Sequence, residues 1–150
     1  MTQLEPAGDP FDLARFVAAQ EGVYERALVE LGDGRKRTHW MWFIFPQLRG
    51  LGGSETARRF GISGVDEARA YLAHAVLGPR LVAAGEAVLR TGERSAREVL
   101  GAPDDLKLCS CATLFASVSE GPDSVHGRLL ERFFDGQRDP ETLRLLAEVG

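Results

Sequence analysis

The segment HWMWFIF at residues 39–45, closed by Pro46, decides the fold class of this chain. Seven consecutive residues that are mostly aromatic or apolar are compatible with a buried strand or with a short buried helix, and periodicity does not distinguish the two. A lone strand would have nothing to pair with, and no other segment alternates apolar and polar residues between hairpin turns. We therefore expect helix here and an all-α fold.

On both sides of this segment, the sequence predicts helices joined by short loops. Apolar residues at helical spacing predict a helix over Phe11–Leu31, starting near Asp9 and ending at the glycines of 32–34. Sequences typical of a capping box begin at Ser63 and Ser95, and Ser54 can cap a short helix. The other expected helices cover 54–60, 65–75, 79–90, 95–101, 104–119, 123–134 and 141–149. The prediction is a compact single-domain bundle of seven or eight helices at 11–150, preceded by a tail at 1–10.

Length and composition support a folded, water-exposed domain. The chain has 150 residues, 44% apolar and 27% charged, which is enough apolar material for a core and argues against disorder. Its formal net charge of −4 disfavours a nucleic-acid partner. No apolar run reaches the roughly 18 residues of a membrane span, and residues 1–10 do not resemble a secretory signal. We expect a cytoplasmic protein with no membrane partner.

The cysteines and histidines do not predict a metal site. Cys109 and Cys111 point in opposite directions on a helix, so we expect two free, reduced thiols in small core or boundary positions. A Cys-x-Cys pair alone is insufficient for zinc, and no histidines stand four apart. We expect no metal and no cofactor. His126, on a late helix, is expected at the surface.

The aromatic segment has two compatible interpretations. It can be a central core helix, in which Trp40 or Trp42 is largely buried. It can also form the wall of a pocket, in which His39 and Gln47 supply the few polar contacts that a ligand site needs.

Several stretches together resemble a known family. They are Phe16–Gln20, Lys36, His39–Leu48, Leu51-Gly52, Glu67–Leu72 with His74, Leu77–Leu81, Asp105–Leu108 and Thr113–Phe115. Over roughly residues 11–145 the chain resembles the domain-of-unknown-function family numbered 1810, whose members are small helical bundles. Some members carry a calpastatin label, which does not suit a chain that is expected to fold, because calpastatin-type inhibitors are disordered. The family often has serines where this chain has Cys109 or Cys111. The resemblance implies a fold and a set of positions, but no activity.

Polar and aromatic residues at these positions are the candidate site. His39, His74 and Lys107 are the candidate catalytic residues, since histidine titrates near neutral pH and the pKa of lysine shifts readily. The candidate ligand-binding residues are Gln20, Lys36, Trp42, Gln47, Tyr71, Arg80 and Thr113.

Simpler roles compete with these assignments. Sixteen of the eighteen basic residues are arginine, which makes the two lysines notable. Even so, Lys107 could pair with Asp104 or Asp105, and Lys36 could be a solvated loop charge. His74 could be present only because a positive imidazole interacts favourably with the dipole at the C-terminal end of its expected helix. We expect Lys107 to point toward the same cleft as His39 and His74.

The sequence favours a small-molecule site beside segment 39–47. The expected ligand is anionic or nucleotide-like, and hydrolysis of an N-glycoside or phosphoester is left open. The alternative is a protein-interaction module with an exposed aromatic groove and no catalysis. Nucleic-acid binding through Arg35, Lys36 and Arg37 ranks third because the chain is acidic. The sequence leaves the oligomeric state undetermined.

Overall fold

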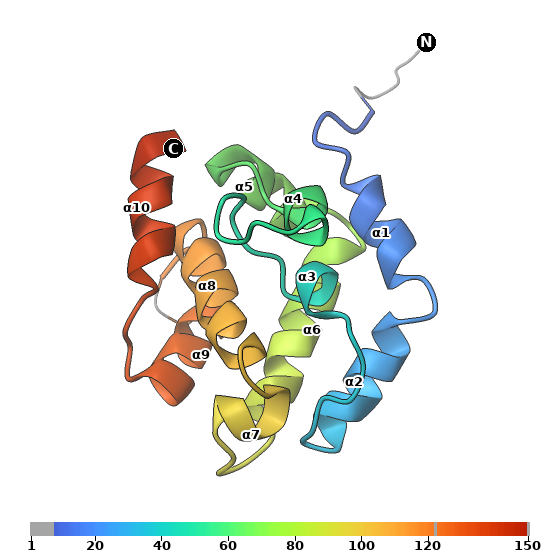
Figure 1. Cartoon of the computed structure of the whole chain (residues 1–150), viewed down its shortest axis with the longest axis vertical. Helices are drawn as coiled ribbons and strands as arrows, with labels where there is room; N and C mark the ends of the chain where they lie inside the picture. Colours follow the sequence, from blue (N-terminus) through green and yellow to red (C-terminus); the bar gives the residue numbers. More distant parts are fainter. Residues whose placement is uncertain (1–7, 122, 150) are drawn as a thin grey trace.

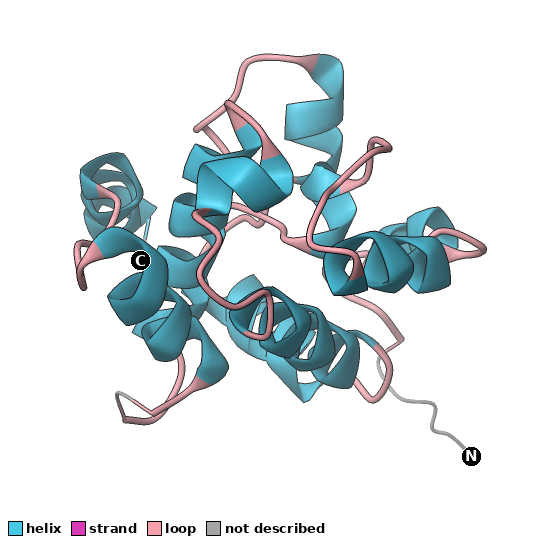
Figure 2. Cartoon of the chain, turned by 90° about the horizontal axis from the view of Figure 1, so that it is seen from below, coloured by secondary structure: helices cyan, strands magenta, loops and turns pink. Residues whose placement is uncertain are grey.

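The computed structural model describes residues 8–121 and 123–149, and within them the regular structure is entirely helical (Figures 1 and 2). These residues form ten helices rather than seven or eight, so the fold class is confirmed and the number is not. They are α1 (Ala14–Gln20), α2 (Tyr24–Gly32), α3 (Met41–Ile44), α4 (Glu55–Phe60), α5 (Val65–Ala73), α6 (Leu77–Leu89), α7 (Ala96–Leu100), α8 (Asp104–Ser117), α9 (Val125–Phe134) and α10 (Pro140–Val149). Residues 1–7 of the expected tail lie outside the described residues.

The first expected helix is divided in two at Gly22, which has a φ of +69°. That left-handed conformation suits glycine and ends α1 before α2 begins. The expected start near Asp9 is confirmed in a specific form. The Asp9 carboxylate accepts hydrogen bonds from the backbone N–H groups of Leu13 (2.7 Å) and Ala14 (2.8 Å). Those two bonds hold the pKa of Asp9 below its usual value, against the smaller raising effect of burial.

Serine side chains cap the N-termini of α4, α7 and α9. The hydroxyl of Ser54 accepts from the N–H of Ala57, and Ser95 forms a complete capping box with Glu98, as its sequence predicts. The capping box expected at Ser63 is wrong. Gly64 occupies the N-cap position of α5 without a side-chain bond, and the N–H of Ser63 instead donates to the Glu67 carboxylate.

The aromatic segment forms only one turn of helix, α3, placed centrally among the longer helices (Figure 1). Trp40, which precedes it, is 1% exposed, whereas Trp42 is half-buried. The prediction that one of the two tryptophans is buried is therefore confirmed, with Trp40 as that residue.

The core is built around α8 and α6, the two longest of the described helices. α8 packs against α5, α7, α9 and α10, and α6 packs against α2, α5 and α9. Tyr71 lies at the centre, with its ring edge-on to Phe16 at 5.1 Å and tilted toward Phe115 at 5.4 Å. The short helix α3 itself packs against α1 and α4.

Within the described residues, no single helix combines the length and apolar character of a membrane span. The pair α5 and α6 meets those criteria only when the two are joined across a bend of 88°.

Candidate functional site

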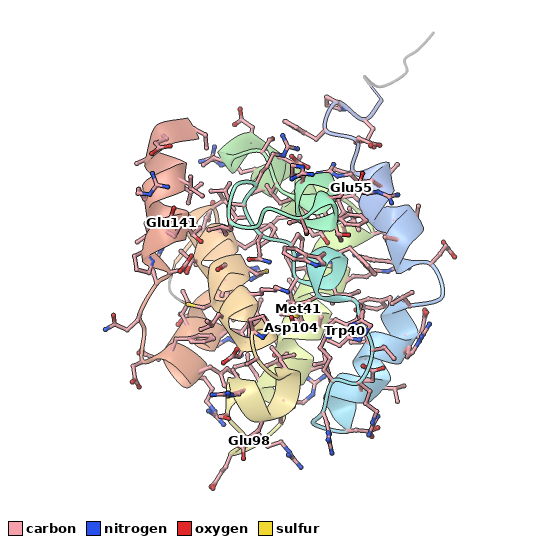
Figure 3. The ribbon with its side chains drawn as sticks, viewed as in Figure 1. Trp40, Met41, Glu55, Glu98, Asp104 and Glu141 are labelled. Carbon is pink, nitrogen blue, oxygen red and sulfur yellow. The ribbon has the colours of Figure 1, made fainter. Side chains whose placement is uncertain are left out.

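A cleft of about 290 Å³ lies between α3 and the first turns of α8. Its wall includes Trp42 and Met41 from α3, Thr56 from α4, and His39 from the preceding loop. Figure 3 shows Asp104, at the start of α8, near the centre of the molecule beside the ribbon of α3. Lys36, Lys107, Trp40 and Phe43 complete the lining. The cleft therefore gathers both lysines of the chain and one of its histidines.

The two lysines share one carboxylate. The Nζ of Lys36 lies 2.8 Å from one oxygen of Asp104, and the Nζ of Lys107 lies 3.1 Å from the other. Burial alone would raise the pKa of Asp104, but the hydrogen bonds from the two ammonium groups outweigh it and leave that pKa below its usual value. The carboxylate is therefore ionised at neutral pH.

Each ammonium group also faces an indole ring. Lys107 Nζ is 4.3 Å from the ring centroid of Trp42, and Lys36 Nζ is 5.1 Å from that of Trp40. Both distances lie within the roughly 6 Å range of cation–π attraction. These contacts, together with Asp104, hold both charges at the cleft instead of allowing them to extend into solvent.

Glu30 fixes the loop that carries Lys36 and His39. Its side chain, 3% exposed, accepts hydrogen bonds from the N–H groups of Arg37 (2.8 Å) and Thr38 (3.1 Å), from the Thr38 hydroxyl (2.7 Å) and from the Trp40 indole (2.9 Å). Burial would raise the pKa of Glu30, but these four bonds lower it to about 2.

Sequence reasoning did not identify Glu30 as part of this site. An acidic residue in the last turn of α2, beside the buried Leu31 and ahead of a glycine turn, is a signal that could have suggested a buried carboxylate. Such a residue is found inside proteins only when its oxygens have partners.

His74 lies away from this cleft. It lines a separate cleft of about 610 Å³ beside α1, together with residues such as Phe11 and Val17. Its Nδ1 accepts hydrogen bonds from the N–H groups of Val76 and Leu77, both at 3.1 Å, at the start of α6. The expected convergence therefore holds for His39 and Lys107 and does not include His74.

Gln20, Tyr71 and Arg80 form a hydrogen-bonded group beneath α3. The amide nitrogen of Gln20 donates to the backbone carbonyl of Phe43 (2.8 Å) and to the Tyr71 hydroxyl oxygen (3.3 Å), and Arg80 donates to the Gln20 amide oxygen (3.1 Å). Burial raises the pKa of Tyr71 far above its usual value, so this phenol stays neutral. None of the three lines the cleft, but through Phe43 they support the helix that does.

Two further candidates lie outside the cleft lining. Thr113 is buried in α8, and its hydroxyl accepts from the N–H of Asp139 (2.9 Å), which ties the start of α10 to α8. Gln47 is buried after α3, and its side-chain nitrogen has no hydrogen-bond partner among the described residues.

The two cysteines and His126 lie outside the lining of the cleft between α3 and α8. Cys109 and Cys111 are free thiols, one half-buried and one buried, as their spacing predicts. In residues 8–121 and 123–149 no three His, Cys, Asp or Glu side chains gather closely enough to hold an ion. His126, expected at the surface, is 3% exposed, so that expectation is wrong.

Comparison with known proteins agrees with the resemblance found in the sequence. The model of the family described as "Protein of unknown function (DUF1810)" matches residues 10–146. The chain belongs to this family. No curated protein matches the sequence.

A solved structure shows the same DUF1810 architecture. It is the crystal structure of the conserved hypothetical protein Rv1873 from Mycobacterium tuberculosis. The two sequences are 52% identical, the match covers 93% of this chain and 99% of the other, and the TM-score is 0.90. The helical arrangement around the cleft is thus that of an experimentally determined structure with a similar sequence.

Proposed function

We propose that this DUF1810 protein binds a small anionic ligand in the cleft between α3 and α8. Lys36 and Lys107 contact the anionic group, and Trp42 and His39 form the wall against the rest of the ligand. The observation that carries the proposal is the pairing of two ammonium groups with one carboxylate, Asp104. The residues lining the cleft therefore have more positive than negative charge.

The hydrogen-bonding capacity of the lysines supports the same conclusion. An ammonium group has three N–H donors, and each lysine directs one toward Asp104. Among the described residues, neither ammonium group has another hydrogen-bond acceptor. An oxyanion entering the cleft would accept hydrogen bonds from the remaining N–H donors. Because Asp104 already holds the two ammonium groups in place, the entropic cost of binding is reduced.

The size of the cleft limits the ligand. Its volume of about 290 Å³ is at the lower end of the roughly 300–1,000 Å³ typical of small-molecule sites. A phosphorylated sugar or a mononucleotide suits this volume, and the indole of Trp42 offers an apolar wall for a base or sugar.

Hydrolysis of an N-glycoside or phosphoester is a further step of the proposal. His39 is exposed at the cleft and is placed to exchange protons with a bound ligand, while Lys107 is placed to stabilise developing negative charge. His74 lines another cleft, so it has no part in this step.

Calorimetry with adenosine monophosphate, ribose 5-phosphate and inorganic phosphate tests the binding. We expect saturable binding of at least one of them, weakened about tenfold or more by Lys36→Met or Lys107→Met, because each change removes a charge-assisted contact. Arg26→Met, at an exposed arginine on α2, is the control and should bind like the wild type.

The same samples, analysed for free phosphate and free adenine, test hydrolysis and its dependence on His39. Failure of all three probes to bind saturably would contradict the binding proposal.

An aromatic docking surface for a protein has less support. Trp40 is buried and Trp42 faces the cleft, so the two indoles do not form a flat exposed patch. We place the proposed function in the cytoplasm, where thiols such as Cys109 and Cys111 stay reduced.

A further inference from the structure

The cleft where the start of α9 meets α6, called the second cleft below, is larger than the cleft with the lysines and separate from the cleft beside α1. It has a volume of about 620 Å³, and its wall includes the apolar residues Leu72, Pro79, Val82 and Val125. This volume lies inside the roughly 300–1,000 Å³ range of small-molecule sites. Val82 is one of the large apolar side chains that the fold leaves exposed.

Most polar side chains of this second cleft already have partners. Glu86 and Arg128 form an ion pair with each other at 2.7 Å. The hydroxyl of Ser119 donates to the Phe115 carbonyl (2.7 Å), and that of Ser124 accepts from the N–H of Gly127 (3.1 Å) as the cap of α9. Each of these side chains therefore already has at least one partner within the fold.

His126 is the exception. The residue is 3% exposed, it lines the second cleft, and its side chain makes no hydrogen bond within the described residues. Its ring packs on that of Phe115, with centroids 5.5 Å apart and planes at 34°, which fixes its orientation. A ring nitrogen at the cleft that makes no hydrogen bond within the fold is open to a bound hydrogen-bonding group.

We propose that the second cleft binds an uncharged, mainly apolar molecule whose single hydroxyl group hydrogen-bonds to the imidazole of His126. This site is separate from the anion site and does not depend on it.

The charge at the second cleft supports an uncharged ligand. Burial lowers the pKa of His126 to about 4, so the imidazole is neutral at pH 7. The paired Glu86 and Arg128 cancel each other's charge, and the apolar wall would penalise an ion that lost its water. A neutral imidazole has one donor and one acceptor, which match the acceptor and donor of a hydroxyl group.

Two probes of the same shape test the proposal, 4-methylphenol and toluene, because they differ in one hydroxyl group. Titration at pH 7, followed by ¹H–¹⁵N NMR, should show saturable shifts at the amides of Val82, Ala83 and Val125. We expect 4-methylphenol to bind about three- to tenfold more tightly than toluene, as one net hydrogen bond predicts.

Three variants separate the contributions. His126→Phe keeps the ring but removes its nitrogens, so it should bind toluene as before and lose the preference for 4-methylphenol. Val82→Trp fills the cleft and should abolish binding of both probes. Val29→Trp makes the same change at another exposed valine, outside the cleft, and should bind both probes like the wild type.

Equal affinities of the two probes for the wild type would overturn the proposal. So would shifts centred elsewhere, or no saturation within the solubility of the probes. If His126→Phe does not fold, the wild-type comparison and the two tryptophan variants still decide the outcome.

Discussion

Replacing Glu30 with glutamine tests whether its buried carboxylate holds the loop of the anion site. The carboxylate accepts four hydrogen bonds, and its pKa is about 2 compared with an ordinary value of 4.5. Glutamine resembles the protonated acid in shape and charge, so it loses the advantage that these bonds give to the ionised form. At 1.36 kcal/mol per pKa unit, this shift corresponds to about 3 kcal/mol.

The predicted loss depends on pH in a defined direction. Because folding lowers the pKa of Glu30, its contribution is fully present above pH 4.5 and disappears as the pH falls toward 2. Glu30→Gln should therefore reduce the free energy of unfolding by about 3 kcal/mol at pH 7 and by progressively less between pH 4.5 and pH 2.

Urea unfolding followed by circular dichroism, at pH 7 and at several values below pH 4.5, measures both effects. Glu21→Gln is the control, because Glu21 is exposed and its side chain has no hydrogen-bond partner among the described residues. The control should stay within about 0.5 kcal/mol of the wild type. If Glu30→Gln behaves like the control at pH 7, or if its loss is the same at every pH, the carboxylate does not have the role described here.

Three other changes have predicted effects on the free energy of unfolding, measured by urea titration. Lys36→Met or Lys107→Met alone should cost about 1 kcal/mol or less because the other ammonium group still pairs with the shared carboxylate, and the double variant should cost more than the sum by leaving that charge unpaired. Trp40→Ala should cost about 3–5 kcal/mol through the cavity it creates, and a wild-type-like midpoint would contradict its central packing. Because folding lowers the pKa of His126 to about 4, its neutral form should stabilise the fold above pH 6.5, with that contribution lost as the pH falls toward 4, and His126→Phe should remove this decline.

Local sequence signals predicted the structure correctly where a few neighbouring residues contain the whole interaction. The capping box at Ser95 and the cap at Ser54 are such cases, since the hydroxyl and the N–H that it caps lie three residues apart. The same reasoning failed at Ser63, because Glu67 accepts the N–H of Ser63 and also pairs with Arg15 from a distant helix. It also passed over the break at Gly22, where apolar residues at helical spacing continue on both sides.

Part of the candidate site was also accessible from sequence. The scarcity of lysine pointed to Lys36 and Lys107, and the aromatic segment pointed to the wall that they share with His39. His74 was assigned to the same site on equal grounds, yet it follows α5, accepts hydrogen bonds from the N–H groups at the start of α6 and lines another cleft. For the lysines and the histidines alike, residue type suggested a role in binding or catalysis, but it did not predict which cleft the side chain would face.

The sequence by itself determined the all-α class, most of the helix starts and the burial of one tryptophan, because these depend on local spacing and on the total apolar content. Only the tertiary structure decided that Asp104 would bridge two lysines 71 positions apart in the chain, that Glu30 would hold their loop, and that His126 would be buried. The physical reason is that a charged or polar side chain is stable inside a protein only with partners, and those partners come from segments that the packing of the core brings together.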